Sequence, residues 1–155
     1  MLISTFILTA VITAVAALPT ATDLTPRAGG PTAKPIPPTC SVTNPLPLAS
    51  ADKSYIPGDS VKDVQLYSAY YPSPSPNKTA LAQQCLEQCY GYGDSTQCKS
   101  AFWAENVPTP PGYYGTPGGQ LLTACLMYTR PLEGGDFAVA PGGQATDAFA
   151  GNIAC

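Results

Sequence analysis

The sequence predicts a small domain of mixed helix and strand that disulfide bonds hold together. Three observations lead to this: an even number of cysteines, one segment with helical apolar spacing, and several strand-like segments separated by proline and glycine. The cysteines are Cys40, Cys85, Cys89, Cys98, Cys125 and Cys155. In a chain of this size that opens with an apolar leader, such a set is typical of a disulfide framework formed in an oxidising compartment.

The first residues predict a signal peptide over 1–17. Residues 2–17 carry no charged side chain, and the run is shorter than the roughly 20 apolar residues of a membrane-spanning helix. The small residues Val15-Ala16-Ala17 fit the small-x-small pattern of signal peptidase sites. A buried N-terminal helix or an uncleaved anchor is the alternative. We expect a secreted protein, extracellular or in the cell wall, without a membrane anchor.

Composition narrows the classes of function. The net charge is −3, and no cluster of basic residues is present, which argues against nucleic acid as a partner. The chain contains no histidine, the commonest general base and metal ligand. The cysteines also lack the paired short spacings of a zinc site. We therefore expect no catalytic residue, no metal and no cofactor.

Residues 18–39 differ in composition from the rest of the chain. They are rich in proline, threonine and alanine and have no apolar periodicity. This composition predicts an extended linker or a propeptide. The folded domain is expected over 40–155, beginning at the first cysteine.

The segment 79–90 is the clearest helix in the chain. Leu81, Cys85 and Cys89 recur at four-residue steps and so share one face, which Ala82 and Leu86 widen. The opposite side carries Gln83, Gln84, Glu87 and Gln88. The expected start cap is Asn77 or Thr79, and the expected end is Gly91 or Gly93.

Three segments predict strands: 60–67, 98–106 and 121–129. One or two more short strands are expected in 136–155. We expect a turn at 55–59, a break at 70–76, and a loop over 107–120 whose prolines and glycines end the strand ladder.

Three of these cysteine-bearing segments together resemble the PAN/apple family. They are CLEQC at 85–89, CKSAFWAENV at 98–107 and ACLMY at 124–128, inside an outer cysteine pair. More narrowly, GYYGTPGGQLLTACLMYTRPL at 112–132 and AGNIAC at 150–155 look like the apple-type domains of secreted fungal proteins.

The resemblance implies an α+β fold in which an antiparallel sheet of about five strands cradles one helix. It also implies the pairs Cys89–Cys98, Cys85–Cys125 and Cys40–Cys155, whereas the cysteine count alone leaves the pairing open. Members of the family usually place an aromatic residue soon after the strand cysteine. Here Ser100-Ala101 come first and Phe102-Trp103 follow, so which aromatic faces the helix stays open.

Two features indicate extracellular sites. Asn77-Lys78-Thr79 is an N-glycosylation sequon, with an unused sequon or a plain helix cap as the alternative. Trp103, Tyr113 and Tyr114 are candidate ligand contacts, because exposed aromatic rings stack on sugars or bury in protein partners. The alternative is that these rings pack the core and the loop. Tyr70 and Tyr71 form a weaker second candidate.

Two Gly-Asp-Ser triplets, at 58–60 and 93–95, superficially resemble an esterase nucleophile motif. That chemistry needs a base for the hydroxyl proton, and without histidine we interpret both as turns. The carboxylates show no pairing typical of a glycosidase. The resulting hypothesis is a non-enzymatic binding module for extracellular polysaccharide or protein, because PAN/apple domains are generally adhesive. The alternative is a structural cell-wall or effector-like protein without a small-molecule site.

Overall fold

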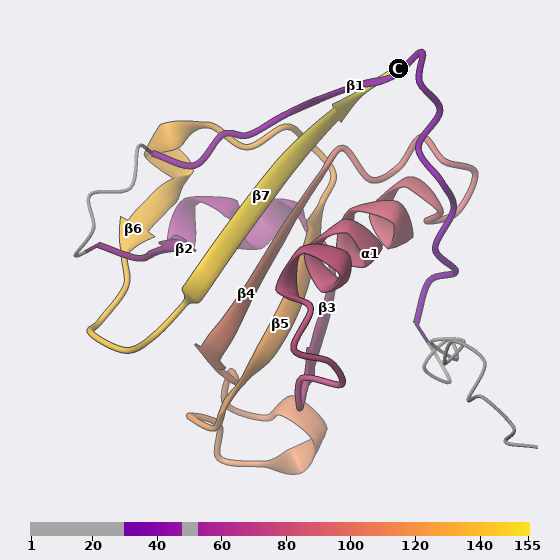
Figure 1. The fold of residues 1–155 in the computed structure, drawn as a ribbon. Coiled ribbons are helices and arrows are strands. Elements are labelled where there is room, and N and C mark those ends of the chain that lie inside the picture. The colour runs from indigo at the N-terminus through magenta and orange to yellow at the C-terminus, as the bar shows by residue number, and fades with distance from the viewer. Residues whose placement is uncertain (1–29, 48–52) are drawn as a thin grey trace, which may run out of the picture.

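A five-stranded antiparallel sheet forms the centre of the protein, with the strand order β1-β7-β4-β5-β3 (Figure 1). The computed structural model describes residues 30–47 and 53–155, so the predicted signal peptide 1–17 lies outside the described residues. The strands are β1 (Ser41–Thr43), β3 (Gln65–Tyr71), β4 (Ser100–Pro108), β5 (Leu121–Tyr128) and β7 (Thr146–Ala154). The predicted α+β sheet of about five strands is confirmed.

One helix, α1 (Lys78–Tyr90), covers one face of this sheet. Its buried residues are the predicted ones: Leu81, Ala82, Cys85, Leu86 and Cys89. Asn77 is the N-cap, and its Oδ1 accepts a hydrogen bond from the backbone N–H of Ala80 at 3.1 Å. Gly91 follows the last turn as the C-cap. Both predicted ends of the helix are confirmed.

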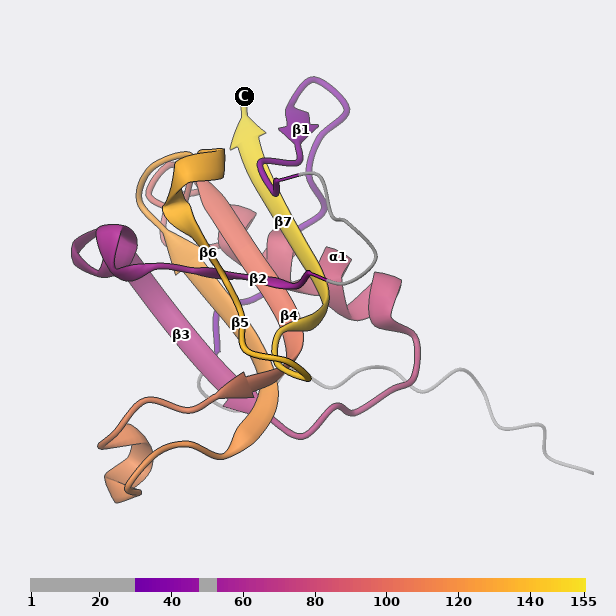
Figure 2. The same ribbon diagram turned by 90° about the vertical axis from the view of Figure 1, so that its left-hand side faces the viewer.

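A second layer covers the opposite face of the sheet (Figure 2). Strand β2 (Tyr55–Pro57) pairs with β6 (Phe137–Val139), and the 3₁₀ helices η1 (Asp59–Val64) and η3 (Gly134–Asp136) flank them. Together they bury the apolar cluster that contains Val61, Phe102, Tyr128 and Leu132. The domain therefore has two cores, one on each side of the sheet.

Strand alternation on β4 assigns the two neighbouring aromatic residues to different cores. Trp103 packs with α1, whereas Phe102 packs with the β2–β6 side, where its ring lies 6.2 Å from that of Phe137. Successive side chains of a strand point to opposite faces, so only one of the pair can meet the helix. Trp103, and not Phe102, is therefore the aromatic residue that faces the helix, a choice that the sequence left open.

Two predictions around residue 60, a strand at 60–67 and a turn at 55–59, are wrong in detail. Residues 59–64 form η1 rather than the first part of a strand, and Asp59 pairs with Lys62 across one turn at 2.8 Å. Val61 is 1% exposed, so this turn is anchored in the core. The expected turn at 55–59 instead contains β2, where Pro57, which lacks an N–H, occupies the end of an edge strand.

Two further boundaries also differ from the prediction. Strand β3 continues through Tyr70 and Tyr71, which pair with Ala124 and Thr123, so the break begins only at the first proline of 72–76. Strand β4 continues to Pro108 because a bulge between Ala104 and Val107 restores pairing with β5. Strand β5 matches the predicted segment 121–129 to within one residue. Strands β6 and β7 lie within 136–155, where one or two short strands were expected.

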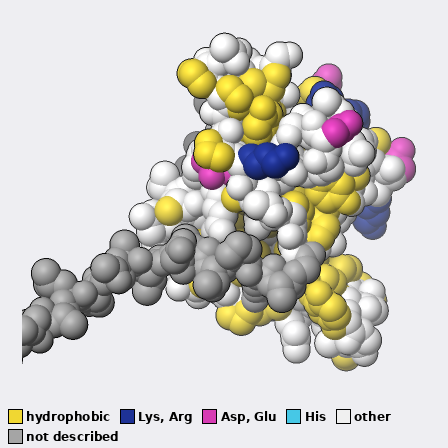
Figure 3. All heavy atoms as spheres, turned by 90° about the vertical axis from the view of Figure 1, so that its right-hand side faces the viewer, with side chains coloured by type: hydrophobic (Ala, Val, Ile, Leu, Met, Phe, Trp, Pro, Cys, Tyr) yellow, Lys and Arg dark blue, Asp and Glu magenta, His cyan; other side chains and the backbone are white. Residues whose placement is uncertain are grey.

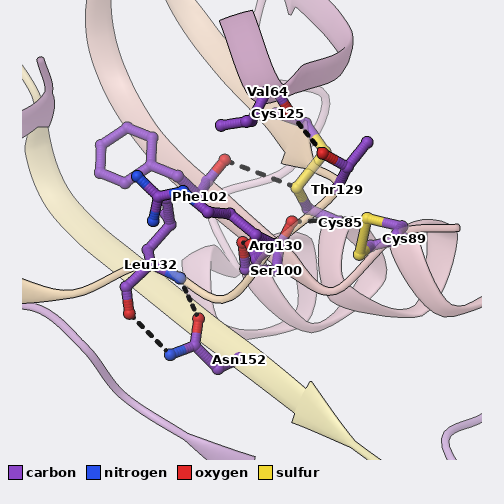
Figure 4. The surroundings of a disulfide bond; sticks show 11 residues. Val64, Cys85, Cys89, Ser100, Phe102, Cys125, Thr129, Arg130, Leu132 and Asn152 are labelled. Atoms are coloured by element: carbon purple, nitrogen blue, oxygen red, sulfur yellow. Dashed lines mark hydrogen bonds between the residues drawn. A yellow bond between two sulfur atoms is a disulfide. The ribbon is translucent and has the colours of Figure 1, made fainter. Parts of the chain in front are cut away.

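Three disulfide bonds connect these elements, and their pairing is the one that the resemblance implied. Cys40–Cys155 joins the start of β1 to the end of β7. Cys85–Cys125 fastens α1 to the middle of β5 (Figure 4), and Cys89–Cys98 connects α1 to the entry of β4. Beside them, the Asn152 side chain exchanges two hydrogen bonds with the backbone of Leu132, at 2.8 and 2.9 Å.

The described part of the predicted linker, residues 30–39, lies against the end of α1 and contains no helix or strand. The backbone N–H of Lys34 donates to the carbonyl of Glu87 at 3.1 Å, and Ile36 packs on the helix-side core. We refer to residues 30–38 as the strap. Among the described residues, none of the helices has the length and apolarity that crossing a bilayer would require.

Candidate binding site

The loop 109–120 between β4 and β5 carries two of the three predicted aromatic ligand residues. Its neck is closed by backbone hydrogen bonds from Thr109 N–H to the Gln120 carbonyl and from Gly119 N–H to the Thr109 carbonyl, both 2.8 Å long. Thr109 is 3% exposed, and its hydroxyl accepts a third bond from the N–H of Gln120. The tip of the loop therefore projects from a fixed base.

The chain folds back tightly inside this tip. Gly112 N–H donates to the Thr116 carbonyl at 2.8 Å, and Thr116 N–H donates to the Tyr113 carbonyl at 3.1 Å. At Gly118, whose φ is +83°, a Cβ atom would lie 2.6 Å from the backbone nitrogen of Pro111. Only glycine suits this close approach, so the proline- and glycine-rich composition specifies a compact tip.

Tyr113 fastens the tip to the edge of the sheet. Its hydroxyl accepts a hydrogen bond from the backbone N–H of Tyr70 at 3.0 Å, on the outer edge of β3. The two rings meet edge to face with centroids 4.9 Å apart. Tyr113 is half-buried, so its first role is to pack the loop onto β3. Burial, and secondarily Tyr113, raises the pKa of the Tyr70 hydroxyl above its ordinary value.

Tyr114 is turned outward by this arrangement. It is 90% exposed, the highest value among the large hydrophobic residues that the structure describes. Its backbone is left-handed, with φ 48° and ψ 35°, a conformation that costs an L-residue about 1–2 kcal/mol. Its ring leans edge-on against Tyr113, with centroids 4.6 Å apart. The fold therefore tolerates a strained backbone at Tyr114 and exposes its aromatic ring to solvent.

The surroundings of Tyr114 are uncharged. Residues 107–123 contain no acidic or basic side chain. On the face seen in Figure 3, charged side chains lie in the upper part and at the right, and the lower part shows hydrophobic and other uncharged atoms. A ring in such surroundings suits an uncharged ligand with an apolar face.

Trp103 does not join this site. It is 1% exposed and lies in the helix-side core, so the expectation of an exposed ring face for stacking is corrected. Side-chain alternation along β4 places it on the face of the sheet that α1 covers. Its indole Nε1 is buried and makes no hydrogen bond with any described residue.

Asn77 is exposed just before α1. Its Oδ1 serves the helix cap, and within the described chain its Nδ2 forms no hydrogen bond. The amide nitrogen that would carry a glycan is therefore compatible with the cap. Occupancy of the sequon stays a prediction.

The Gly-Asp-Ser triplet at 58–60 begins the 3₁₀ helix η1, and the one at 93–95 lies in a turn. Gly58 caps η1, and Asp94 accepts hydrogen bonds from the backbone N–H and hydroxyl of Thr96 at 3.1 and 2.6 Å. Within 30–47 and 53–155, no cluster of three metal-ligating side chains is present.

Nothing in the sequence indicated the ion pair between Arg130 and Asp136, whose side chains are 39% and 10% exposed. Arg130 binds the Asp136 carboxylate through both terminal nitrogens, at 2.7 and 2.8 Å. The hydrogen bonds from Arg130 lower the pKa of Asp136 to about 2, although partial burial acts in the opposite direction. Ser60 also donates to this carboxylate, which joins η1 to η3. Arg130 and Asp136 are six positions apart in an irregular segment, so no sequence periodicity signals the pair.

No family model, curated protein or solved structure matches this chain in the comparisons with known proteins. The chain is a small disulfide-rich α+β domain with one helix packed on an antiparallel sheet.

Proposed function

We propose that this protein is a secreted, non-enzymatic binding module that recognises extracellular carbohydrate through the ring of Tyr114. The observation that carries the proposal is the strained, 90% exposed Tyr114 held on a loop that Tyr113 fastens to β3. Strained backbone persists only where the surrounding structure over-determines it, and it concentrates at functional sites. A rigidly presented ring binds with little loss of side-chain entropy.

Two further features support this class of function. The sequence resembles the PAN/apple family, whose members are generally adhesive, and the apolar leader favours secretion. Three disulfide bonds are typical of chains that fold in an oxidising compartment.

The distribution of apolar surface favours a sugar over a protein partner. The other exposed large hydrophobic residues in the described chain are Val42 on β1, Val139 on β6 and Leu121 at the loop base. Val42 and Val139 lie in different sheets, on elements other than the loop that carries Tyr114. A stable protein interface buries on the order of 800 Å² per partner, whereas a single ring with uncharged neighbours matches the apolar face of a sugar.

Binding to insoluble chitin, glucan and cellulose tests the proposal. We expect the wild-type chain to sediment with at least one polymer, Tyr114→Ala to lose retention, and Tyr114→Phe to keep it because the ring remains. Val139→Ala, at an exposed apolar position on β6, is the matched control and should bind like wild type. Equal retention of Tyr114→Ala and wild type would contradict the proposal. Retention on no polymer would favour the structural or effector-like alternative.

A further inference from the structure

A second site lies away from the Tyr114 loop, in a pocket of about 290 Å³ between the start of α1 and the strands beneath it. The lining residues are Lys78, Thr79, Ala82 and Gln83 of α1, Trp103 of β4, and Asp147 and Phe149 of β7. None of them belongs to the loop 109–120. The pocket is therefore independent of the function proposed for Tyr114.

One of the aromatic residues that line the pocket, Trp103, carries an unsatisfied donor. Trp103 and Phe149 are directly opposite each other in the β4–β7 pairing, so they share the face of the sheet that α1 covers. The indole Nε1–H of Trp103 is buried and has no acceptor among the described residues. A buried donor without a partner costs about 1–3 kcal/mol. An oxygen atom supplied by a bound molecule would remove that cost.

Two of the lining residues, Lys78 and Asp147, belong to an ion-pair cluster that also includes Glu105. The Nζ of Lys78 contacts the carboxylate of Glu105 at 3.1 Å and that of Asp147. The hydrogen bond to Asp147, followed by that to Glu105, raises the pKa of Lys78 above its ordinary value. One cation between two carboxylates leaves hydrogen-bond donors and acceptors side by side. Hydroxyl groups both donate and accept, so they suit such a cluster.

The backbone beside this cluster is strained at three non-glycine residues. Asn106, Ala145 and Asp147 have φ values of +56°, +47° and +54°. The Ala145 N–H donates to the Asn106 carbonyl at 3.2 Å, and the Asn106 side chain donates to the hydroxyl of Thr146 at 2.9 Å. These bonds hold Asp147 in place at the start of β7.

We propose that this pocket binds one pyranose ring of a neutral sugar. The ring would place its apolar face on Phe149, offer an oxygen to the Trp103 indole, and exchange hydroxyl hydrogen bonds with Lys78 and Asp147. A pocket of about 290 Å³ lies at the lower end of the roughly 300–1,000 Å³ of small-molecule sites. That volume corresponds to one sugar ring rather than a chain of them.

The ring has two possible sources with the same chemistry. One is the first sugar of a glycan on Asn77, because Lys78 and Thr79, the next two residues, line the pocket. The Asn77 Oδ1 is engaged with Ala80, and its Nδ2 makes no bond within the described chain, which leaves that nitrogen available for attachment. The other source is a free glycan outside the protein.

The single tryptophan of the chain makes the test specific, because a ¹⁵N–¹H correlation spectrum contains only one indole resonance. The secreted protein is compared in two forms: trimmed to the first sugar on Asn77, and with the glycan removed by an amidase that leaves aspartate. Aspartate is as good a helix cap as asparagine, so α1 is preserved. A downfield indole shift in the one-sugar form identifies the protein's own glycan as the occupant.

The second arm titrates the sugar-free form with N-acetylglucosamine, glucose, mannose and galactose. A saturable indole shift with one of them identifies a free sugar as the occupant. The same resonance position in both glycoforms and in every titration overturns the proposal.

Variants locate the effect and separate it from the Tyr114 site. Asp147→Asn removes the carboxylate but tolerates the left-handed backbone, and Gln83→Arg fills the pocket entrance from an exposed position of α1. Both should reduce the indole shift, whereas Tyr114→Ala and the surface control Glu133→Gln should leave it unchanged. A full shift in Gln83→Arg would overturn the assignment to this pocket even if Asp147→Asn failed to fold.

Discussion

Removing the Cys85–Cys125 bond by a double change to alanine tests how the disulfides stabilise this domain. The bond closes a loop with a sequence separation of 40 residues, and Cys89–Cys98 closes one of 9. The chain-entropy relation assigns about 3.9 kcal/mol to the longer loop and about 2.6 kcal/mol to the shorter at 25 °C. A domain of this size has a free energy of unfolding of roughly 5–15 kcal/mol, so either loss is large.

The shorter bond provides a matched control for the longer one. All four cysteines are buried, with exposed fractions between 0% and 4%, so the two alanine pairs leave comparable voids. The difference between the variants therefore reports loop length, and we expect Cys85→Ala/Cys125→Ala to lose about 1.3 kcal/mol more than Cys89→Ala/Cys98→Ala.

Guanidinium unfolding followed by circular dichroism measures both losses on the same protein. Equal slopes of the transitions are needed to compare the two free energies directly. A loss for the short-loop variant that equals or exceeds that of the long-loop variant would refute the entropic reasoning.

Two further predictions concern contacts that hold the irregular segments. Arg130 holds the pKa of Asp136 at about 2, below the 3.8 of the free carboxyl. The contribution of this ion pair to the free energy of unfolding is therefore fully present above pH 4 and is lost as pH falls from about 4 to 2. Thermal unfolding should show a loss of about 1–2 kcal/mol, a figure reduced because Arg130 is partly exposed to solvent, and Asp136→Asn should abolish this pH dependence. At Gly91 an added Cβ would collide with the carbonyl oxygen of Thr32 in the strap, so Gly91→Ala should cost about 1–3 kcal/mol and expose the strap to limited proteolysis. Gly142→Ala is the control, because a Cβ added there has no neighbouring atom within 4 Å. If Gly91→Ala is as stable and as resistant to protease as this control, the strap does not pack against Gly91.

The helix was predictable because its signals are local. Leu81, Cys85 and Cys89 fall on one face through the 3.6-residue period alone, and the Asn77 cap bonds a residue three positions away. Strand β5 was predictable for a similar reason, since its apolar run is long and bounded by glycines and an arginine-proline pair.

The missed elements depend on distant partners. The three residues of β2 form a strand only because β6, more than 70 positions later, pairs with them. Val61 lies in η1 because its side chain is buried in the core on the β2–β6 side. The apolar and polar residues around it alternate as in a strand, so the sequence pattern did not indicate this turn. Short edge strands and single turns carry too few residues for a periodic signal to outweigh such contacts.

The candidate sites divide in the same way. The sequence alone located the aromatic pair on the loop and the sequon at Asn77, because turn-forming residues and a three-residue motif are readable in order along the chain. Only the tertiary structure decided three other features: which tyrosine of the loop faces solvent, which aromatic residue of β4 contacts the helix, and that Lys78 pairs with Asp147. The physical reason is that burial and ion pairing depend on which segments meet across the sheet, and that is set by strand register and disulfide closure rather than by neighbours in the chain.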